Sequence, residues 1–379
     1  MFDYEMLKLI WWGLIGVLLI GFALTDGFDM GAGMLLPFVG RTDSERRVVL
    51  NTVAPHWEGN QVWLVTAGGA LFAAWPMVYA TAFSGFYWAM LLVLFALFFR
   101  PVGFDYRSKL TDPRWRGTWD WLLFVGSFVP ALVFGVAFGN LLLGVPFELD
   151  DTLRSHYSGS FVALLNPFGL LAGLVSVTMI ATHGGTWLAL RADGAVQERA
   201  RRFASLTALL YLLAFIAAGL WVSYGLQGYT LVPGQNTGRI LNPLAKTVLH
   251  NNVGWLANYH DYPLTWLAPL SGVGGAVLTL LLLRVGRGGA AMLGSSLSIV
   301  GTILTAGLAL FPFILPSSTS PASSLTIWDA TSSQRTLGIM LVVAMIMVPT
   351  ILLYTSWGYW KMRGRIGTRH IDDNSHSAY

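Results

Sequence analysis

Long apolar runs alternate with short polar segments along the whole of this chain. A helix of about 20 apolar residues, rising 1.5 Å per residue, spans the hydrocarbon core of a bilayer. The pattern predicts nine such helices over residues 9–36, 57–75, 79–99, 120–143, 161–183, 203–226, 264–283, 291–315 and 336–360. The second run is the weakest because it opens on the polar segment HWEGNQ.

The Lys and Arg residues gather in every second segment between these runs. Basic residues accumulate on the cytoplasmic side of short loops. With nine helices, a periplasmic N-terminus and a cytoplasmic C-terminus, the cytoplasmic segments hold most of the 23 basic residues. Acids precede the first run where a secretory signal would carry basic residues, so we expect this helix to be retained. The predicted fold is an all-α integral membrane protein.

The composition agrees with a membrane protein and excludes several other classes. Of the 379 residues, 55% are hydrophobic and 11% are charged, which gives more apolar surface than one soluble core can bury. The basic residues form short clusters without a continuous basic surface, so we expect no nucleic-acid partner. Cysteine is absent, which excludes disulfides and thiolate ligands.

Three carboxylates are predicted to lie at one depth in the membrane. Counted from the outer end of the first helix, Asp26 lies about 25 Å and Asp29 about 30 Å along the axis. Counted from the outer end of the second helix, Glu58 lies about 25 Å inward. Asp105 follows the third helix and lies slightly further toward the cytoplasm. The spacing of three places Asp26 and Asp29 on one helix face.

Ionised acids inside a membrane are costly, about 2.5 to 3.5 kcal/mol each at a helix centre and less near the interface. Burial and mutual repulsion favour proton uptake by at least one of such a group. We therefore interpret the set as a proton path from the cytoplasm. In the alternative interpretation, the acids cap local helix breaks at TDG and HWEGN or pair with Arg41 or Arg100.

The histidines of this chain are candidate ligands for haem iron. Haem iron needs an axial His, Met, Cys or Tyr inside the bundle. Only His56 and His183 lie near helix ends, both toward the cytoplasm, and the sequence gives neither an obvious partner. We expect no redox metal and no catalytic residue in this chain alone.

Several long motifs resemble subunit II of the bacterial cytochrome bd-type quinol oxidases. They include WWGLIGVLLIGFALTDGFDMGAGMLLPFVGR, APHWEGNQVWLVTAGGALFAAWPMVYA and FFRPVGFDYRSK. The similarity covers essentially the whole chain, which also resembles the bd-II variant of the enterobacterial enzymes. In one departure, Glu58 stands where the best-known relative has Asp.

The resemblance implies a fold of two four-helix bundles and a peripheral helix. We accordingly divide the chain into residues 1–145, the first bundle with the acids, residues 146–360, the second bundle and peripheral helix, and residues 361–379, a cytoplasmic tail that we expect to be mobile. The implied location is the bacterial inner membrane, among lipids and quinol.

The resemblance also implies an activity, in which membrane quinol is oxidised and oxygen is reduced to water with charge separation. The partner, subunit I, would carry haem b and haem d, and a small single-helix accessory subunit would join the complex. Some family members hold a quinone in subunit II. Carried over by motif, Asp26, Asp29, Glu58 and Asp105 belong to the proton path, and Trp57 and Trp63 to the subunit interface or an oxygen path.

Two alternatives remain open from the sequence. Intramembrane acids and glycine-interrupted helices also occur in proton-coupled secondary transporters, although the second half of this chain offers only Asp261 and Asp329, both near the outer side. In the other alternative, the chain is a non-catalytic scaffold for its partner subunit.

Overall fold

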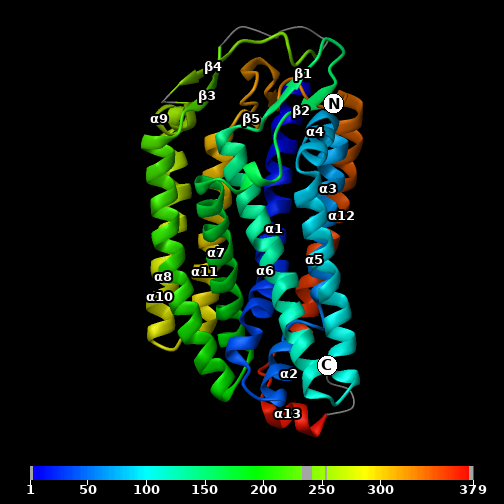
Figure 1. Cartoon of the computed structure of the whole chain (residues 1–379), viewed down its shortest axis with the longest axis vertical. Helices are drawn as coiled ribbons and strands as arrows, with labels where there is room; N and C mark the ends of the chain where they lie inside the picture. The colour runs from blue at the N-terminus through cyan, green and yellow to red at the C-terminus, as the bar shows by residue number, and fades with distance from the viewer. Residues whose placement is uncertain (1–2, 233–240, 252–253, 375–378) are drawn as a thin grey trace.

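The fold is an elongated bundle of helices with short strand pairs at one end (Figure 1). The computed structural model describes residues 3–232, 241–251, 254–374 and 379. The long helices are α1 (Tyr4–Val39), α3 (Trp57–Ala74), α5 (Tyr87–Tyr106), α6 (Pro113–Leu143), α7 (Pro167–Arg191), α8 (Gly194–Gly225), α10 (Leu267–Arg284), α11 (Gly288–Leu310) and α12 (Gln334–Lys361).

Shorter elements connect them. The short α-helices are α2 (Asp43–Asn51), α4 (Pro76–Gly85), α9 (Ala257–Asp261) and α13 (Thr368–Asp373). The 3-10 helices are η1 (Arg107–Lys109), η2 (Val162–Leu165), η3 (Gly254–Leu256), η4 (Pro263–Trp266) and η5 (Pro321–Ser323). Three antiparallel pairs join β1 (Phe147–Leu149) to β2 (Ser155–Tyr157), β3 (Gly228–Leu231) to β4 (Val248–Asn251) and β5 (Phe313–Leu315) to β6 (Leu325–Thr326).

Each of the nine predicted runs overlaps one of the long helices, and eight of these helices in the described part of the chain are long and apolar enough to cross a membrane. The exception is α3, whose first turns carry Glu58, Asn60 and Gln61. The third predicted run, 79–99, is wrong in its bounds, because the chain breaks at Phe86 between α4 and α5. Pro76 begins α4, where its missing N–H is tolerated.

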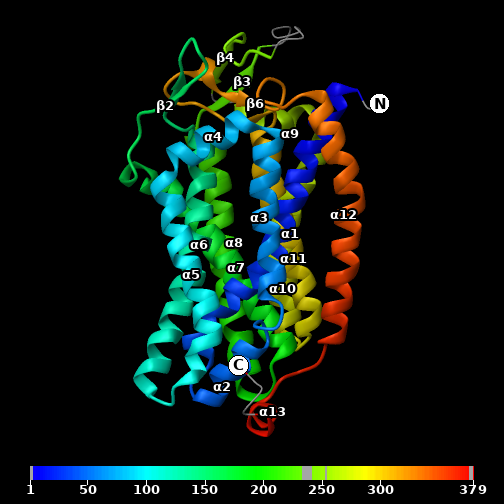
Figure 2. The same ribbon diagram turned by 90° about the vertical axis from the view of Figure 1, so that its right-hand side faces the viewer.

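The long helices form two four-helix bundles and a peripheral helix, as predicted. The first bundle contains α1, α3, α5 and α6, and the second contains α7, α8, α10 and α11. Helix α12 packs on α1 and α3 at the edge and is largely exposed (Figure 2). The chain begins and ends at opposite ends of the molecule. We call these the strand end, near the N-terminus, and the α2 end, near the C-terminus.

The two bundles meet where α1 crosses α7, with glycine on both sides. A Cβ atom added to Gly184 would lie 2.2 Å from the backbone carbon of Gly31, and one added to Gly31 would lie 2.2 Å from the carbonyl oxygen of Ile180. Small residues let helices in membranes approach this closely. Here the backbones touch directly, and Asp26 and Asp29 precede the contact on α1.

The α2 end is closed by residues that the sequence suggested were mobile. Residues 368–373 form α13, which packs on α2 through the fully buried Ile371. Ser44 donates a hydrogen bond to Asp372, and Ile366 pairs with Ala192 in a β-bridge. The expectation of a mobile tail is therefore wrong for this segment, because one apolar side chain and backbone pairing hold it. Residues 375–378 lie outside the described part.

Candidate functional site

Asp26 lies in the continuous helix α1 and faces Arg100 of α5. The carboxylate oxygens Oδ2 and Oδ1 lie 2.8 and 2.5 Å from the two terminal guanidinium nitrogens. Both side chains are buried. Helix α1 runs unbroken through TDG, so Asp26 does not cap a helix break, and its pairing is the one with Arg100 that the alternative interpretation named.

Asp29 lies one turn further along α1 and has different partners. Asn60 Nδ2, from α3, donates a 2.7 Å hydrogen bond to Asp29 Oδ2. Tyr359, from α12, donates a hydrogen bond to the amide oxygen of Asn60. The second carboxylate oxygen, Oδ1, is buried and accepts no hydrogen bond from the described residues, and His56 Nδ1 lies 3.8 Å from it. Three segments far apart in sequence thus converge on one buried carboxylate.

Aromatic rings surround His56. The ring centroids of Tyr359, Trp187 and Phe28 lie 5.1, 5.5 and 5.6 Å from the imidazole centroid, each in an edge-to-face arrangement. Phe28 also stacks on Trp187, with centroids 4.0 Å apart. The imidazole side chain retains 9% exposure. His56 therefore lies next to the buried Asp29 and is itself slightly exposed at the surface of the chain.

Glu58 and Asp105 are placed differently from the two α1 acids, because both are exposed on this chain. Glu58 lies in the first turn of α3, where a negative charge suits the helix dipole. It precedes Asn60 by two residues, which places the two side chains on different faces of α3. Trp57 is half-buried, whereas Trp63 is buried against α1, where a Cβ on Gly21 would meet its ring at 2.6 Å.

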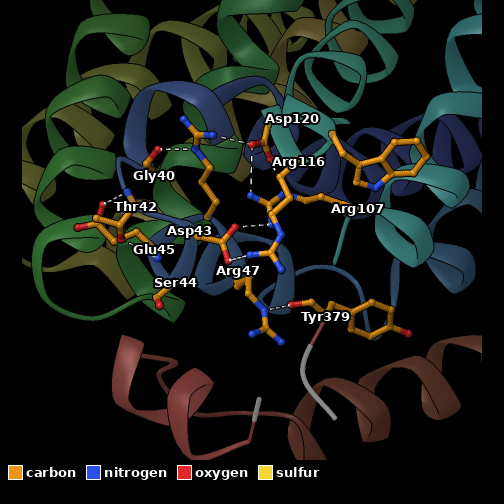
Figure 3. Close-up of polar contacts among 12 residues, drawn as sticks. Gly40, Thr42, Asp43, Ser44, Glu45, Arg47, Arg107, Arg116, Asp120 and Tyr379 are labelled. Atoms are coloured by element: carbon orange, nitrogen blue, oxygen red, sulfur yellow. Dashed lines mark hydrogen bonds and ion pairs between the residues drawn. The ribbon is translucent and has the colours of Figure 1, made fainter. Parts of the chain in front are cut away.

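A network of ion pairs holds the α2 end together (Figure 3). Arg107 is fully buried and lies 2.6 Å from Asp120 of α6 and 3.1 Å from Asp43 of α2. Arg46 also contacts Asp120, at 2.7 Å, and Arg116 contacts Asp43, at 2.6 Å. These contacts join α2, η1 and α6 at the α2 end, so the loops at this end are fixed relative to the first bundle.

Sequence reasoning missed Asn60, Tyr359 and Asp120. Asp120 could have been found by the argument used for Asp26, because it too is an acid next to an apolar run. Asn60 and Tyr359 carry no charge, and only the packing of α3 and α12 against α1 shows their role. His56 was considered only as a haem ligand.

The two α1 acids thus differ in the chemistry open to them. Asp26 is compensated by the guanidinium of Arg100, which is itself buried. Oδ1 of Asp29 accepts no hydrogen bond from the described residues and lies near the imidazole of His56. Oδ2 accepts its hydrogen bond from the neutral amide of Asn60. A neutral donor leaves a carboxyl able to exist in either protonation state. The two α1 acids are therefore held by partners of different charge, a guanidinium for Asp26 and a neutral amide for Asp29.

The buried histidine of the second bundle has both of its ring nitrogens occupied. His183 Nε2 lies 2.9 Å from the carbonyl oxygen of Leu24, and Nδ1 lies 2.8 Å from the hydroxyl of Ser295. An imidazole that is hydrogen-bonded on both sides does not offer a lone pair to haem iron. The described residues contain no group of three or more acids, histidines or cysteines arranged to hold a metal ion. Both ring nitrogens of His183 are therefore already engaged within this chain.

Comparison with known proteins gives consistent matches. The family described as cytochrome bd terminal oxidase subunit II matches residues 7–362. The chain is 58% identical to cytochrome bd-I ubiquinol oxidase subunit 2 of Escherichia coli K12 and 50% identical to a probable cytochrome oxidase subunit 2 of Haemophilus influenzae, with all of each chain covered. It is 32% identical to cytochrome bd ubiquinol oxidase subunit 2 of Bacillus subtilis, over 94% of this chain and 96% of the relative.

A solved structure also shares this fold. The structure of bd oxidase from Geobacillus thermodenitrificans matches with a TM-score of 0.66 over 94% of this chain and 99% of the other, at 17% sequence identity.

Proposed function

Because this chain belongs to the cytochrome bd terminal oxidase subunit II family, we propose that it brings protons from the α2 end toward an oxygen-reducing site on a partner subunit. The chain is a subunit of a bd-type quinol oxidase and a multi-pass protein of the bacterial inner membrane. Such a complex contains haem and a further subunit. Its reaction oxidises membrane quinol, reduces oxygen to water and separates charge.

The partner is proposed to cover the face formed by α3, α5 and α12, which lie on one flank of the molecule in Figure 1. Exposed apolar side chains on this face include Val65, Phe95 and Ile346. Glu58 is exposed on the same helix as Val65. A carboxylate left against lipid is costly, so its position on α3 favours coverage by a protein that uses it.

The position of Glu58 supports its assignment as the acid closest to the partner. Asp105 is exposed at the end of α5, nearer the α2 end, and would take up protons from that side. Asp29 and His56 would form a second set of groups behind α3, connected through Asn60. Asp26 holds Arg100 in place and so sets the electrostatic potential around Asp29.

The haems are proposed to lie on the partner, as haem b and haem d of subunit I. The hydrogen bonds on both nitrogens of His183 support this assignment. The quinol-oxidising site would also belong to the partner, and an accessory single-helix subunit would complete the assembly. Trp57, half-buried beside Phe104 with ring centroids 5.5 Å apart, remains a candidate for the subunit interface, and Trp63 for an oxygen path.

The test is the variant Glu58→Gln, measured in the purified complex. Loss of a proton-transferring group is expected to slow quinol-dependent oxygen consumption on the order of 100-fold, with the haem absorption spectrum unchanged. Glu148→Gln makes the same chemical change on an exposed acid at the strand end, and full activity is expected there.

Three outcomes would contradict the proposal. Unchanged turnover in Glu58→Gln would reject a relay through this acid and favour a scaffold role. Parallel loss of haem and activity would show that Glu58 is needed for assembly. A colourless protein that moves solute across vesicle membranes would instead support the transporter alternative.

A further inference from the structure

A groove at the α2 end lies between the end of α1 and the first turns of α8. Its volume is about 330 Å³. It is lined by Phe38, Arg41, Arg199, Arg202, Phe203 and Leu206. Three guanidinium groups and three apolar side chains therefore share one concave surface.

The charge of the groove is positive and partly uncompensated. Arg199 is held in place, with Nε donating a 2.7 Å hydrogen bond to the carbonyl oxygen of Val39 and Nη2 lying 2.7 Å from Glu45. Arg202 is 74% exposed and contacts only the exposed Glu198 among the described acids. Arg41 is exposed, and its guanidinium forms no ion pair in the described part of the chain. The groove therefore favours an anion.

The apolar side of the groove continues along α8. Leu206, Leu209, Leu210 and Leu213 are 52%, 46%, 43% and 58% exposed. Their spacing of three and four residues places them on the helix face that also carries Arg202. Across the groove, Phe38 is 43% exposed and lies 6.2 Å, centroid to centroid, from the exposed ring of Trp121. Aromatic rings of this kind are typical of the headgroup layer.

The groove lies away from the proposed partner face. Figure 1 shows α8 and α10 on one flank, with α3, α5 and α12 on the other. A ligand that presents a phosphate to Arg41 and Arg202 and a hydrocarbon chain to the leucines of α8 matches both parts of this surface. Basic sites beside membrane helices bind anionic lipid headgroups in this way.

We propose that the groove between α1 and α8 binds the phosphodiester headgroup of an anionic phospholipid. Arg41 and Arg202 contact the phosphate, and Arg199 is a positioning residue held by Glu45. The acyl chain lies along the leucines of α8. Neither the oxidase reaction nor the proton path requires this site.

The test compares retained lipid in complexes purified from vesicles of phosphatidylcholine with added phosphatidylglycerol. Arg41→Gln with Arg202→Gln is expected to weaken phosphatidylglycerol retention roughly fivefold for each guanidinium removed. The matched control is Arg363→Gln with Arg365→Gln, which removes the same charge from exposed sites at the same end and is expected to leave retention unchanged. Arg41→Lys with Arg202→Lys keeps the charge and is expected to retain most of the lipid.

Equal retention by the double Gln variant and its control would overturn the proposal. Displacement of the lipid by inorganic phosphate alone would assign the groove to free anions and would also overturn it. If the double Gln variant does not assemble, the single variant Arg202→Gln tests the proposal, because this exposed side chain can be replaced without disturbing the core. Unchanged lipid retention in Arg202→Gln contradicts the proposal. Oxygen consumption, measured in parallel, separates failure here from failure of the proton path.

Discussion

Asp26 and Arg100 form a bidentate ion pair in which each carboxylate oxygen meets a separate guanidinium nitrogen, at 2.5 and 2.8 Å. Neither side chain exceeds 1% exposure. Each charge is therefore compensated by the other and not by solvent. We expect Arg100→Gln to destabilise the complex by about 3–5 kcal/mol, because it leaves a buried carboxylate without its cation. Thermal unfolding of the purified complex measures the loss.

The double variant Asp26→Asn with Arg100→Gln is the control for this pair. Because it removes both charges, it should recover a large part of the stability lost in Arg100→Gln. A double variant no more stable than Arg100→Gln would show that the two charges do not depend on each other.

The close contact between Gly31 of α1 and Gly184 of α7 leads to a second prediction. Gly184→Ala would place a Cβ atom 2.2 Å from the backbone of Gly31, so the bundles must separate, at a cost of about 3 kcal/mol or more. The yield of assembled complex in detergent measures this effect. Gly219→Ala, on the neighbouring α8, has no atom within 4 Å of the added methyl, and its yield should match the parent protein.

Glu45 makes α2 sensitive to pH. Burial acts to raise its pKa, but hydrogen bonds from Arg199 and from the backbone N–H groups of Arg41 and Thr42 outweigh this effect, and the pKa lies below its usual value. A carboxyl with a lowered folded-state pKa stabilises the fold above its unfolded pKa, and this stability is lost as the pH falls through the folded value. At pH 7 the free energy of unfolding of the parent should exceed that of Glu45→Gln by about 0.5 to 1 kcal/mol, because Gln keeps the capping hydrogen bond but loses the ion pair with Arg199.

The measurement is thermal unfolding of parent and Glu45→Gln over a series of pH values. The difference between them should be constant near neutral pH and shrink below about pH 4, where the unfolded acid becomes protonated. A difference that persists at low pH would mean that Glu45 acts through packing and not through charge.

Ile371 anchors α13 on α2. The side chain is fully buried, and Ile371→Ala should cost about 2–5 kcal/mol of local stability through lost apolar contact and the cavity left behind. Amide hydrogen exchange in α13 and α2 reports this loss directly. His370→Ala changes an exposed neighbour on the same helix and should leave exchange unaltered, and equal exchange in both variants would contradict the anchoring role.

Much of the fold could be predicted from apolar periodicity, because in a membrane each spanning segment must satisfy its own backbone hydrogen bonds. That constraint located all nine long helices, including the polar α3. It could not locate the break at Phe86, because an apolar run continues through it. It also did not predict that α13 packs on α2, because this packing depends on a single apolar residue, Ile371.

The candidate site could be predicted only in part. Charge inside an apolar run selected Asp26, Asp29 and Glu58 as candidates, and their common depth in the membrane stays a prediction. Orientation around the helix axis was not available, so the separation of Glu58 from Asp29 by α3 was not foreseen. Neutral partners such as Asn60 and Tyr359 carry no signal in composition, and their role depends on contacts between helices far apart in sequence. The assignment of these residues to a proton path stays a prediction.

The docking of α13 on α2 has a consequence for the order of biogenesis. The ribosome makes α2 early, soon after the first crossing, whereas the segment around Ile371 follows α12, the last crossing. Until the segment around Ile371 has been translated, the part of α2 that it contacts stays exposed. Closure of this end by α13 therefore requires that every preceding helix has been synthesised, and in nascent chains stalled before α12 we expect protease attack at α2.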